Sequence, residues 1–167
     1  VRAFGQVFAL KKGNGADAVS VGVRGPVSVH TAVSLDPVVT TSMQITKSVN
    51  GEPGDKKGSD TMGTKHRVDF GVYKLKGSIN VQLAEKTGFS EEDAEKIKYA
   101  LVTLFENDAS SARPEGSISM RKFYWIEHSN KTGNASSAKV HRGIVTALKD
   151  GIEMPKQFSD YIIDDSA

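Results

Sequence analysis

One amphipathic helical segment stands between two stretches of strand-like sequence, and this order constrains the fold of the 167-residue chain more than any other feature. Ser90 suits the start of the helix, because its hydroxyl can accept hydrogen bonds from exposed backbone N–H groups. The acids that follow, through Asp93, complement the helix dipole. Apolar residues then recur on one face, at Ala94, Ile97, Leu101, Leu104 and Phe105. The spacing predicts a helix that lies on a sheet and ends near Asn107.

The segments around this helix alternate between apolar and polar side chains, which is typical of strands. The expected strands are residues 19–39, as one long strand or two short ones, residues 67–81 with one interruption, and residues 117–126. Pro26, after Gly25, indicates a bulge or an edge in the first of them. Asp150-Gly151 predicts a hairpin turn within residues 143–154. Residues 1–10 instead carry apolar side chains at helical spacing.

Residues 40–66 predict a long hairpin with a mobile tip. Short strand-like arms around Ile45 and Met62 flank a polar centre that contains Asn50-Gly51 and Pro53-Gly54. The order strand, hairpin insertion, strand, helix, strand gives most of a ferredoxin-like sheet without its first strand and helix. The fold class is therefore α+β, a partial ferredoxin-like or RNA-recognition-motif palm with an inserted hairpin. The fold alone does not establish a function, because many functions share this scaffold.

Composition excludes several classes of protein. The chain has no cysteine, which removes disulfides and thiolate metal sites and fits a reducing, cytoplasmic setting. No apolar run approaches the roughly 18 residues that span a bilayer, and no signal peptide is recognisable at the start. We expect a soluble chain with no membrane anchor.

Sequence motifs of catalysis and metal binding are also lacking. Gly13-Asn14-Gly15 superficially resembles a dinucleotide fingerprint, but a strand-like segment follows it where a phosphate-binding helix is required. The four histidines have neither HExxH nor i, i+4 spacing, and no GxSxG elbow occurs. We therefore expect no enzyme activity, no metal and no cofactor.

Charge is unevenly distributed along the chain, although the net charge is only +2. Residues 1–90 carry 12 basic and 7 acidic groups, whereas residues 91–110 carry 2 basic and 6 acidic groups. Basic stretches separated by an acidic helix can form one basic face that suits phosphate contacts. The alternative is an ordinary solvated surface of mixed charge.

Two short segments combine cations with side chains that can contact bases. Met62, Lys65, His66 and Arg67 lie together at the foot of the predicted hairpin, where a thioether can wedge between bases and cations can bind phosphates. The alternative is a hairpin foot packed on its own sheet. In the second segment, Arg121 and Lys122 are followed by three aromatic residues, which suits phosphate pairing and base stacking. Packing of those rings in the core is the alternative there.

Six blocks distributed in order along the chain carry a family resemblance. They are VRAFGQVF, GVRGPVSVHTAVSLDPV, TMGTKHRVDFGVYKLKG, LAEKTGFSEEDAEKI, LFENDASSARPEGSIS and QFSDYII. Together they resemble the backbone protein of the CRISPR Cascade complex, the seventh Cas family, and especially its type I-C branch. The resemblance implies a family pattern that continues before Val1 and after Ala167.

The resemblance implies a domain organisation and a set of partners. Residues 1–39 and 67–130 would form the palm, residues 40–66 a thumb hairpin, and residues 131–167 a C-terminal extension packed on the palm. Copies of the chain would stack head to tail along a CRISPR guide RNA, contact other Cascade subunits and present the guide for pairing with target DNA. The thumb would fold over RNA bound by a neighbouring copy and displace a base at regular intervals.

No residue is expected to be catalytic. The candidate RNA-binding residues are Arg24, Met62, Lys65, His66, Arg67, Lys74, Arg113, Arg121 and Lys122. Met62, or secondarily Met43, would press against the displaced base. Two alternatives remain open: a type III-like RNase that uses the thumb aspartate Asp55 or Asp60, and a purely structural oligomerisation module.

Overall fold

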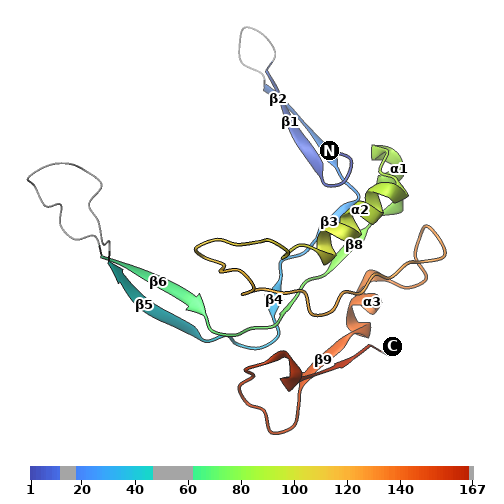
Figure 1. Ribbon diagram of the computed structural model, residues 1–167. Helices are drawn as coiled ribbons and strands as arrows, with labels where there is room; N and C mark the ends of the chain where they lie inside the picture. Colours follow the sequence, from blue (N-terminus) through green and yellow to red (C-terminus); the bar gives the residue numbers. More distant parts are fainter. Residues whose placement is uncertain (12–17, 47–61, 166–167) are drawn as a thin grey trace, which may run out of the picture. The chain divides into compact units, whose positions relative to one another are not determined.

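The computed structural model describes residues 1–11, 18–46 and 62–165 (Figure 1). These residues form two compact units. The first unit contains residues 1–31 and 75–144, and the second contains residues 32–74 and 145–165. Across these described ranges there are three α-helices and five two-stranded antiparallel sheets. The fold class is therefore mixed α and β. Within the same ranges, no helix is long and apolar enough to cross a membrane.

The first unit begins with a β-hairpin where the sequence predicted a helix. Strand β1 (Gly5–Lys11) pairs with β2 (Ala18–Arg24) in a register that runs from Gly5↔Arg24 to Lys11↔Ala18. The prediction from helical spacing was wrong because Phe8 lies opposite Val21, and cross-strand pairing with a β-branched strand outweighs the weak local pattern. Gly5 also has a φ of +78°, which does not occur inside an α-helix.

The Gly25-Pro26 step interrupts the strand-like sequence of residues 19–39. A Cβ on Gly25 would lie 2.3 Å from the carbonyl oxygen of Ala3, so only glycine allows this close crossing of the two backbones. Pro26 is fully buried, and its carbonyl accepts the Asn80 N–H at 3.0 Å. Strand β3 (Val27–Val29) follows and pairs with β8 (Gly77–Ile79). The segment predicted as one long strand or two short ones is thus divided among β2, β3 and a further short strand at Val33–Ser34.

Helix α1 (Val81–Thr87) was not predicted. Asn80 caps its start by accepting the Leu83 N–H at 2.8 Å, and Gly88 ends it with a left-handed φ of +70°. Asparagine before a helix and glycine after it are common capping residues. This signal was not recognised, because residues 67–81 were predicted to form a strand. The strand predicted there is instead reduced to short pieces, of which β8 is the last.

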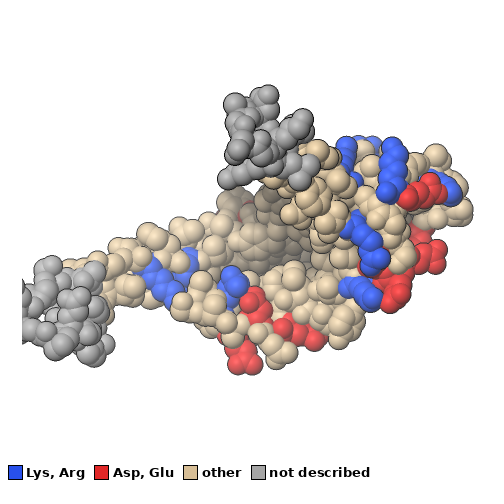
Figure 2. Space-filling model, turned by 90° about the horizontal axis from the view of Figure 1, so that it is seen from above, with Lys and Arg blue, Asp and Glu red and all other residues tan. Residues whose placement is uncertain are grey.

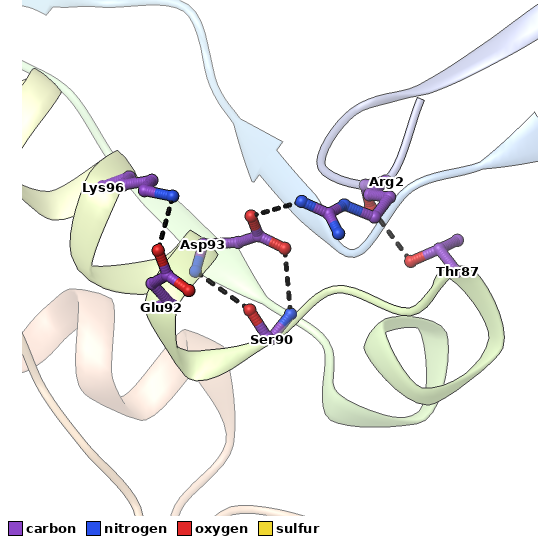
Figure 3. Close-up of polar contacts among 6 residues, drawn as sticks. All are labelled: Arg2, Thr87, Ser90, Glu92, Asp93 and Lys96. Carbon is purple, nitrogen blue, oxygen red and sulfur yellow. Dashed lines mark hydrogen bonds and ion pairs between the residues drawn. The ribbon is translucent and has the colours of Figure 1, made fainter.

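Helix α2 (Glu91–Val102) begins with the capping box that the sequence predicted at Ser90. The Ser90 hydroxyl accepts the Asp93 N–H at 3.2 Å, and the Asp93 carboxylate accepts the Ser90 N–H at 3.1 Å (Figure 3). That backbone bond from Ser90 is the main reason why the pKa of Asp93 lies below its ordinary value. Arg2 donates to the same carboxylate at 2.8 Å, and the Thr87 hydroxyl donates to the Arg2 carbonyl at 2.9 Å. The cap therefore also holds the beginning of the chain.

The helix ends five residues before the predicted end near Asn107. Residues 103–107 form turns, Leu104 is exposed, and Asn107 has a φ of +59°. The apolar spacing continues past Val102, but the helix does not. Leu104 is exposed and so adds no packing energy, and helix propensity alone is too weak to stabilise a further turn.

The segment expected as the strand of residues 117–126 is irregular. Phe123 and Trp125 are half-buried while Tyr124 is more exposed, so the side chains keep the predicted alternation. The Phe123 and Trp125 rings stack with centroids 6.1 Å apart, and the Lys98 ammonium lies 5.5 Å from the Trp125 centroid. No strand of the described chain pairs with this segment, so its contacts come from rings rather than from a backbone ladder.

A short helix that was not predicted, α3 (Ser137–Gly143), is capped by Ser136.

The second unit contains three strand pairs and a short 3-10 helix, η1 (Phe158–Asp160). Strand β4 (Val33–Ser34) pairs with β7 (Tyr73–Lys74), β5 (Thr40–Thr46) with β6 (Met62–Val68), and β9 (Val145–Leu148) with β10 (Tyr161–Asp164). Gly151 forms a turn at φ +79°, as predicted, but β9 pairs with β10 across a longer connection rather than with residues 152–154. Tyr161 is buried in this unit, and burial together with its hydrogen bond to Asp36 raises the pKa of its phenol to about 12.

The continuous sheet of a ferredoxin-like palm is not formed by the described residues, whose strands pair only two by two. The missing strand at residues 117–126 and helix α1 at the end of residues 67–81 account for part of this difference. The expected palm and its domain boundaries at residues 39, 66 and 130 therefore remain predictions. The tip of the hairpin, residues 47–61, lies outside the described residues.

The Ser90 cap gives a test of this fold. We predict that Ser90→Ala lowers the free energy of unfolding by about 1 kcal/mol, because it removes the hydroxyl that accepts the Asp93 N–H. Ser90→Asn is the matched control and should keep most of the stability, since asparagine also caps helices. Urea unfolding followed by circular dichroism measures both. Equal stability of Ser90→Ala and the wild type would show that the cap does not stabilise the first unit.

Candidate nucleic-acid interface

The hairpin formed by β5 and β6 holds four of the candidate residues on one strand. Its ladder runs without a break from Thr40↔Val68 to Thr46↔Met62. Paired residues in an antiparallel sheet share a face, and successive residues alternate between faces. One face, here called the cationic face, carries Thr41, Met43, Ile45, Gly63, Lys65 and Arg67. The other, here called the polar face, carries Thr40, Ser42, Gln44, Thr46, Met62, Thr64, His66 and Val68.

The contacts of individual side chains agree with this division. A Cβ on Gly63 would lie 3.4 Å from Cγ1 of Ile45, its partner in the ladder, so the Ile45 side chain lies over the glycine. The described strands of the hairpin contain one lysine, Lys65, one arginine, Arg67, and no acid. Figure 2 shows basic side chains on the arm of this hairpin.

Arg67 is held in place at the base of the cationic face. Its Nε donates to Asp69 Oδ1 at 2.9 Å, and the hydroxyl of Thr41, the ladder partner of Arg67, donates to the other Asp69 oxygen. The Thr41 hydrogen bond, followed by Arg67, lowers the pKa of Asp69. Asp69 therefore stays ionised and orients the guanidinium. Because both partners are substantially exposed, this pair adds little stability and leaves Arg67 able to bind another anion.

The polar face is occupied by contacts among its own side chains. Ser42 Oγ lies 2.8 Å from Nδ1 of His66, and the Gln44 amide donates to the sulfur of Met62 at 3.0 Å. Met62 and His66 thus lie on the opposite side of the strand from Lys65 and Arg67. The structure brings these four candidates to one strand but does not bring them to one face.

The other candidates are distributed over both units. Lys74 ends β7 in the second unit, together with the hairpin. Arg24, Arg113, Arg121 and Lys122 belong to the first unit. Arg24 is the last residue of β2 and pairs with Gly5, and the Lys122 ammonium lies 5.7 Å from the Tyr124 ring centroid.

Arg113 is already engaged by an acid. Its Nε donates to Oδ2 of Asp108 at 2.8 Å and its Nη2 donates to Oδ1 at 3.2 Å, a two-point ion pair in an exposed turn. The pair lowers the pKa of the Asp108 carboxyl, mainly through the hydrogen bonds from Arg113. A phosphate at Arg113 would have to compete with this carboxylate.

The hairpin can bind phosphates through its cations and can contact bases through the side chains of Met43, Met62 and Ile45. Within the described ranges, no cluster of three or more His, Asp or Glu side chains could hold a metal ion. Asp55 and Asp60, the candidates for an RNase, lie outside those ranges. Sequence reasoning missed Thr41 and Asp69, because their role depends on the ladder register and neither forms part of a motif.

Comparison with known families gives a match that covers nearly the whole chain. The family described as CRISPR-associated protein Cas7 matches residues 1–166. No curated protein matches the chain significantly. The family match includes both units and all of the hairpin residues described above.

The contacts of Asp69 predict a specific titration. We expect Thr41→Val and Arg67→Gln each to raise the Asp69 pKa towards its ordinary value, because each variant removes a hydrogen bond that lowers it, and the bond from Thr41 is the largest single cause. With the native contacts, Asp69 stabilises the fold above its unfolded pKa of about 3.9, and that contribution is lost as the pH falls through the lower folded value. Carboxyl NMR titration measures both variants. An Asp69 pKa that does not change in Thr41→Val would contradict this assignment.

Proposed function

The chain belongs to the Cas7 family of CRISPR-associated proteins, the guide-RNA-binding backbone subunits of CRISPR effector complexes, and we propose that it serves a type I Cascade complex of the I-C kind. Family membership implies a fold related to the RNA-recognition motif. In the proposed complex, copies of the chain stack head to tail along one guide, contact other Cascade subunits and present the guide for pairing with target DNA. The β5–β6 hairpin is the thumb of each copy.

One observation carries this proposal most directly: the register of β5 and β6 aligns Lys65 and Arg67 on one face of an exposed hairpin. The two residues are about 7 Å apart along the strand, since a strand rises about 3.4 Å per residue. Cations on one edge of an extended element can follow the phosphates of a single strand without reading its bases.

This arrangement fits a protein that leaves sequence recognition to base pairing. Phosphate contacts are independent of sequence, so one subunit can bind every part of the guide equally well. The guide then selects the target by Watson–Crick pairing, the division of labour used by RNA-guided effectors. A backbone subunit of this kind needs no catalytic group.

We propose that the subunit has no nuclease activity, in keeping with the general behaviour of type I backbone subunits. The alternative is an RNase of the type III kind, which would depend on Asp55 or Asp60. A structural module that assembles without RNA is the other alternative, and it would not require the cations of the hairpin. Binding measurements on those cations separate this second alternative from the proposal.

We predict that Lys65→Ala combined with Arg67→Ala weakens binding to guide-length single-stranded RNA. The slope of log affinity against log salt should decrease in magnitude by up to about 2, roughly one for each lost phosphate contact. Fluorescence anisotropy at several salt concentrations measures both quantities.

Lys149→Ala combined with Lys156→Ala is the matched control for this experiment. It removes the same charge from exposed positions of the same unit, outside the hairpin. We expect it to change the slope less than the hairpin variant does. Equal slopes for the wild type and the Lys65 and Arg67 double variant would show that the hairpin does not bind phosphate.

A further inference from the structure

The cationic face of the hairpin also carries a row of exposed apolar side chains. Met43 is 38% exposed and Ile45 is 50% exposed, and both lie on β5 beside the cations of β6. Met43 is the ladder partner of Lys65, and Ile45 lies over Gly63. An apolar row next to a cationic row on one face is what a single-stranded nucleic acid requires, with bases on one side and phosphates on the other.

We infer that guide RNA lies across the cationic face, with bases against Met43 and Ile45 and phosphates on Lys65 and Arg67. This inference rests on the proposed function and adds which face of the hairpin receives the RNA. It makes Met43, rather than Met62, the thioether that contacts a base. Methionine suits this position because its flexible, polarisable side chain adapts to different bases.

The contacts of the polar face support the same choice. The Ser42–His66 and Gln44–Met62 contacts connect the two strands across the middle of that face. RNA bound to the polar face would have to replace both contacts. It would also meet no lysine or arginine, because those of the two described strands lie on the cationic face. The exposed apolar groups of that face, Met62 and Val68, stand at opposite ends of β6, so they do not form a row.

The position of Asp69 is also consistent with RNA on the cationic face. The Asp69 N–H donates to the Val39 carbonyl at 3.2 Å and continues the ladder beyond Thr40↔Val68, which places Asp69 on the same face as Arg67. Its carboxylate takes one of the five guanidinium N–H donors of Arg67 and so orients the group. The acid stands at one end of the face, beyond Arg67, and not between the two cations.

Two matched pairs of variants test the inference, because each pair makes the same change on opposite faces of one hairpin. The first pair is Met43→Ala and Met62→Ala, and the second is Ile45→Thr and Val68→Thr, in which a β-branched side chain preserves strand propensity. Affinity for guide-length single-stranded RNA is measured for the full chain at several salt concentrations. Thermal unfolding of each variant shows whether the hairpin change has altered the fold.

We expect Met43→Ala to weaken RNA binding about tenfold, the size of one lost base contact, with the salt slope unchanged because no charge is removed. Ile45→Thr should weaken binding in the same way. Met62→Ala and Val68→Thr should stay within about twofold of the wild type, since they leave the contact surface intact. We expect all four variants to keep the thermal unfolding midpoint of the wild type, which would show that the losses of affinity do not come from an altered fold.

A loss of affinity in Met62→Ala that equals or exceeds the loss in Met43→Ala would overturn the choice of face. The proposed function would survive that result, because RNA would still bind the hairpin. If the wild-type chain itself binds guide-length RNA with no dependence on salt, the proposed function fails, and the inference fails with it.

Discussion

The pairing register of β5 and β6 is the constraint on which the account of this protein depends. A slip of one residue would move every side chain of one strand to the other face and would separate Lys65 and Arg67 from Met43. The unbroken ladder prevents this slip, and the contact of Ile45 with Gly63 fixes the same register through side chains. A two-stranded ribbon is only marginally stable by itself, so a ligand that binds both strands adds to its stability.

Electrostatics explains how a chain of net charge +2 can bind a polyanion. Arg67 and Arg113 each pair with an aspartate, and both partners of each pair are partly exposed. Exposed ion pairs contribute little to stability, so phosphates can share or displace the aspartates at low cost. Local placement of cations matters more than net charge. The hairpin provides this placement because its described strands contain cations and no acids.

The sequence predicted those features that depend on neighbouring residues. The Ser90 capping box was confirmed because its signal is local, and the arms of residues 40–66 do form paired strands because their alternation agrees with their pairing. The predictions for residues 1–10 and 117–126 were wrong. Residues 5–11 form a strand because they pair with β2, and residues 117–126 form none because no described strand pairs with them. The local sequence does not indicate whether a partner strand is present. For the candidate site, the sequence indicated the cations but not their face. That face follows from the register of β5 and β6, which no local sequence pattern specified.

The RNA that this chain carries shows whether it is a guide-RNA-binding backbone subunit. The chain is expressed together with a CRISPR array and its processing machinery, purified at low salt, and its bound RNA is sized on a denaturing gel and sequenced. We predict RNA of one uniform guide length that originates from the array, with several protein copies for each RNA. Recovery of the chain free of RNA, or with cellular RNA of many lengths, would contradict it.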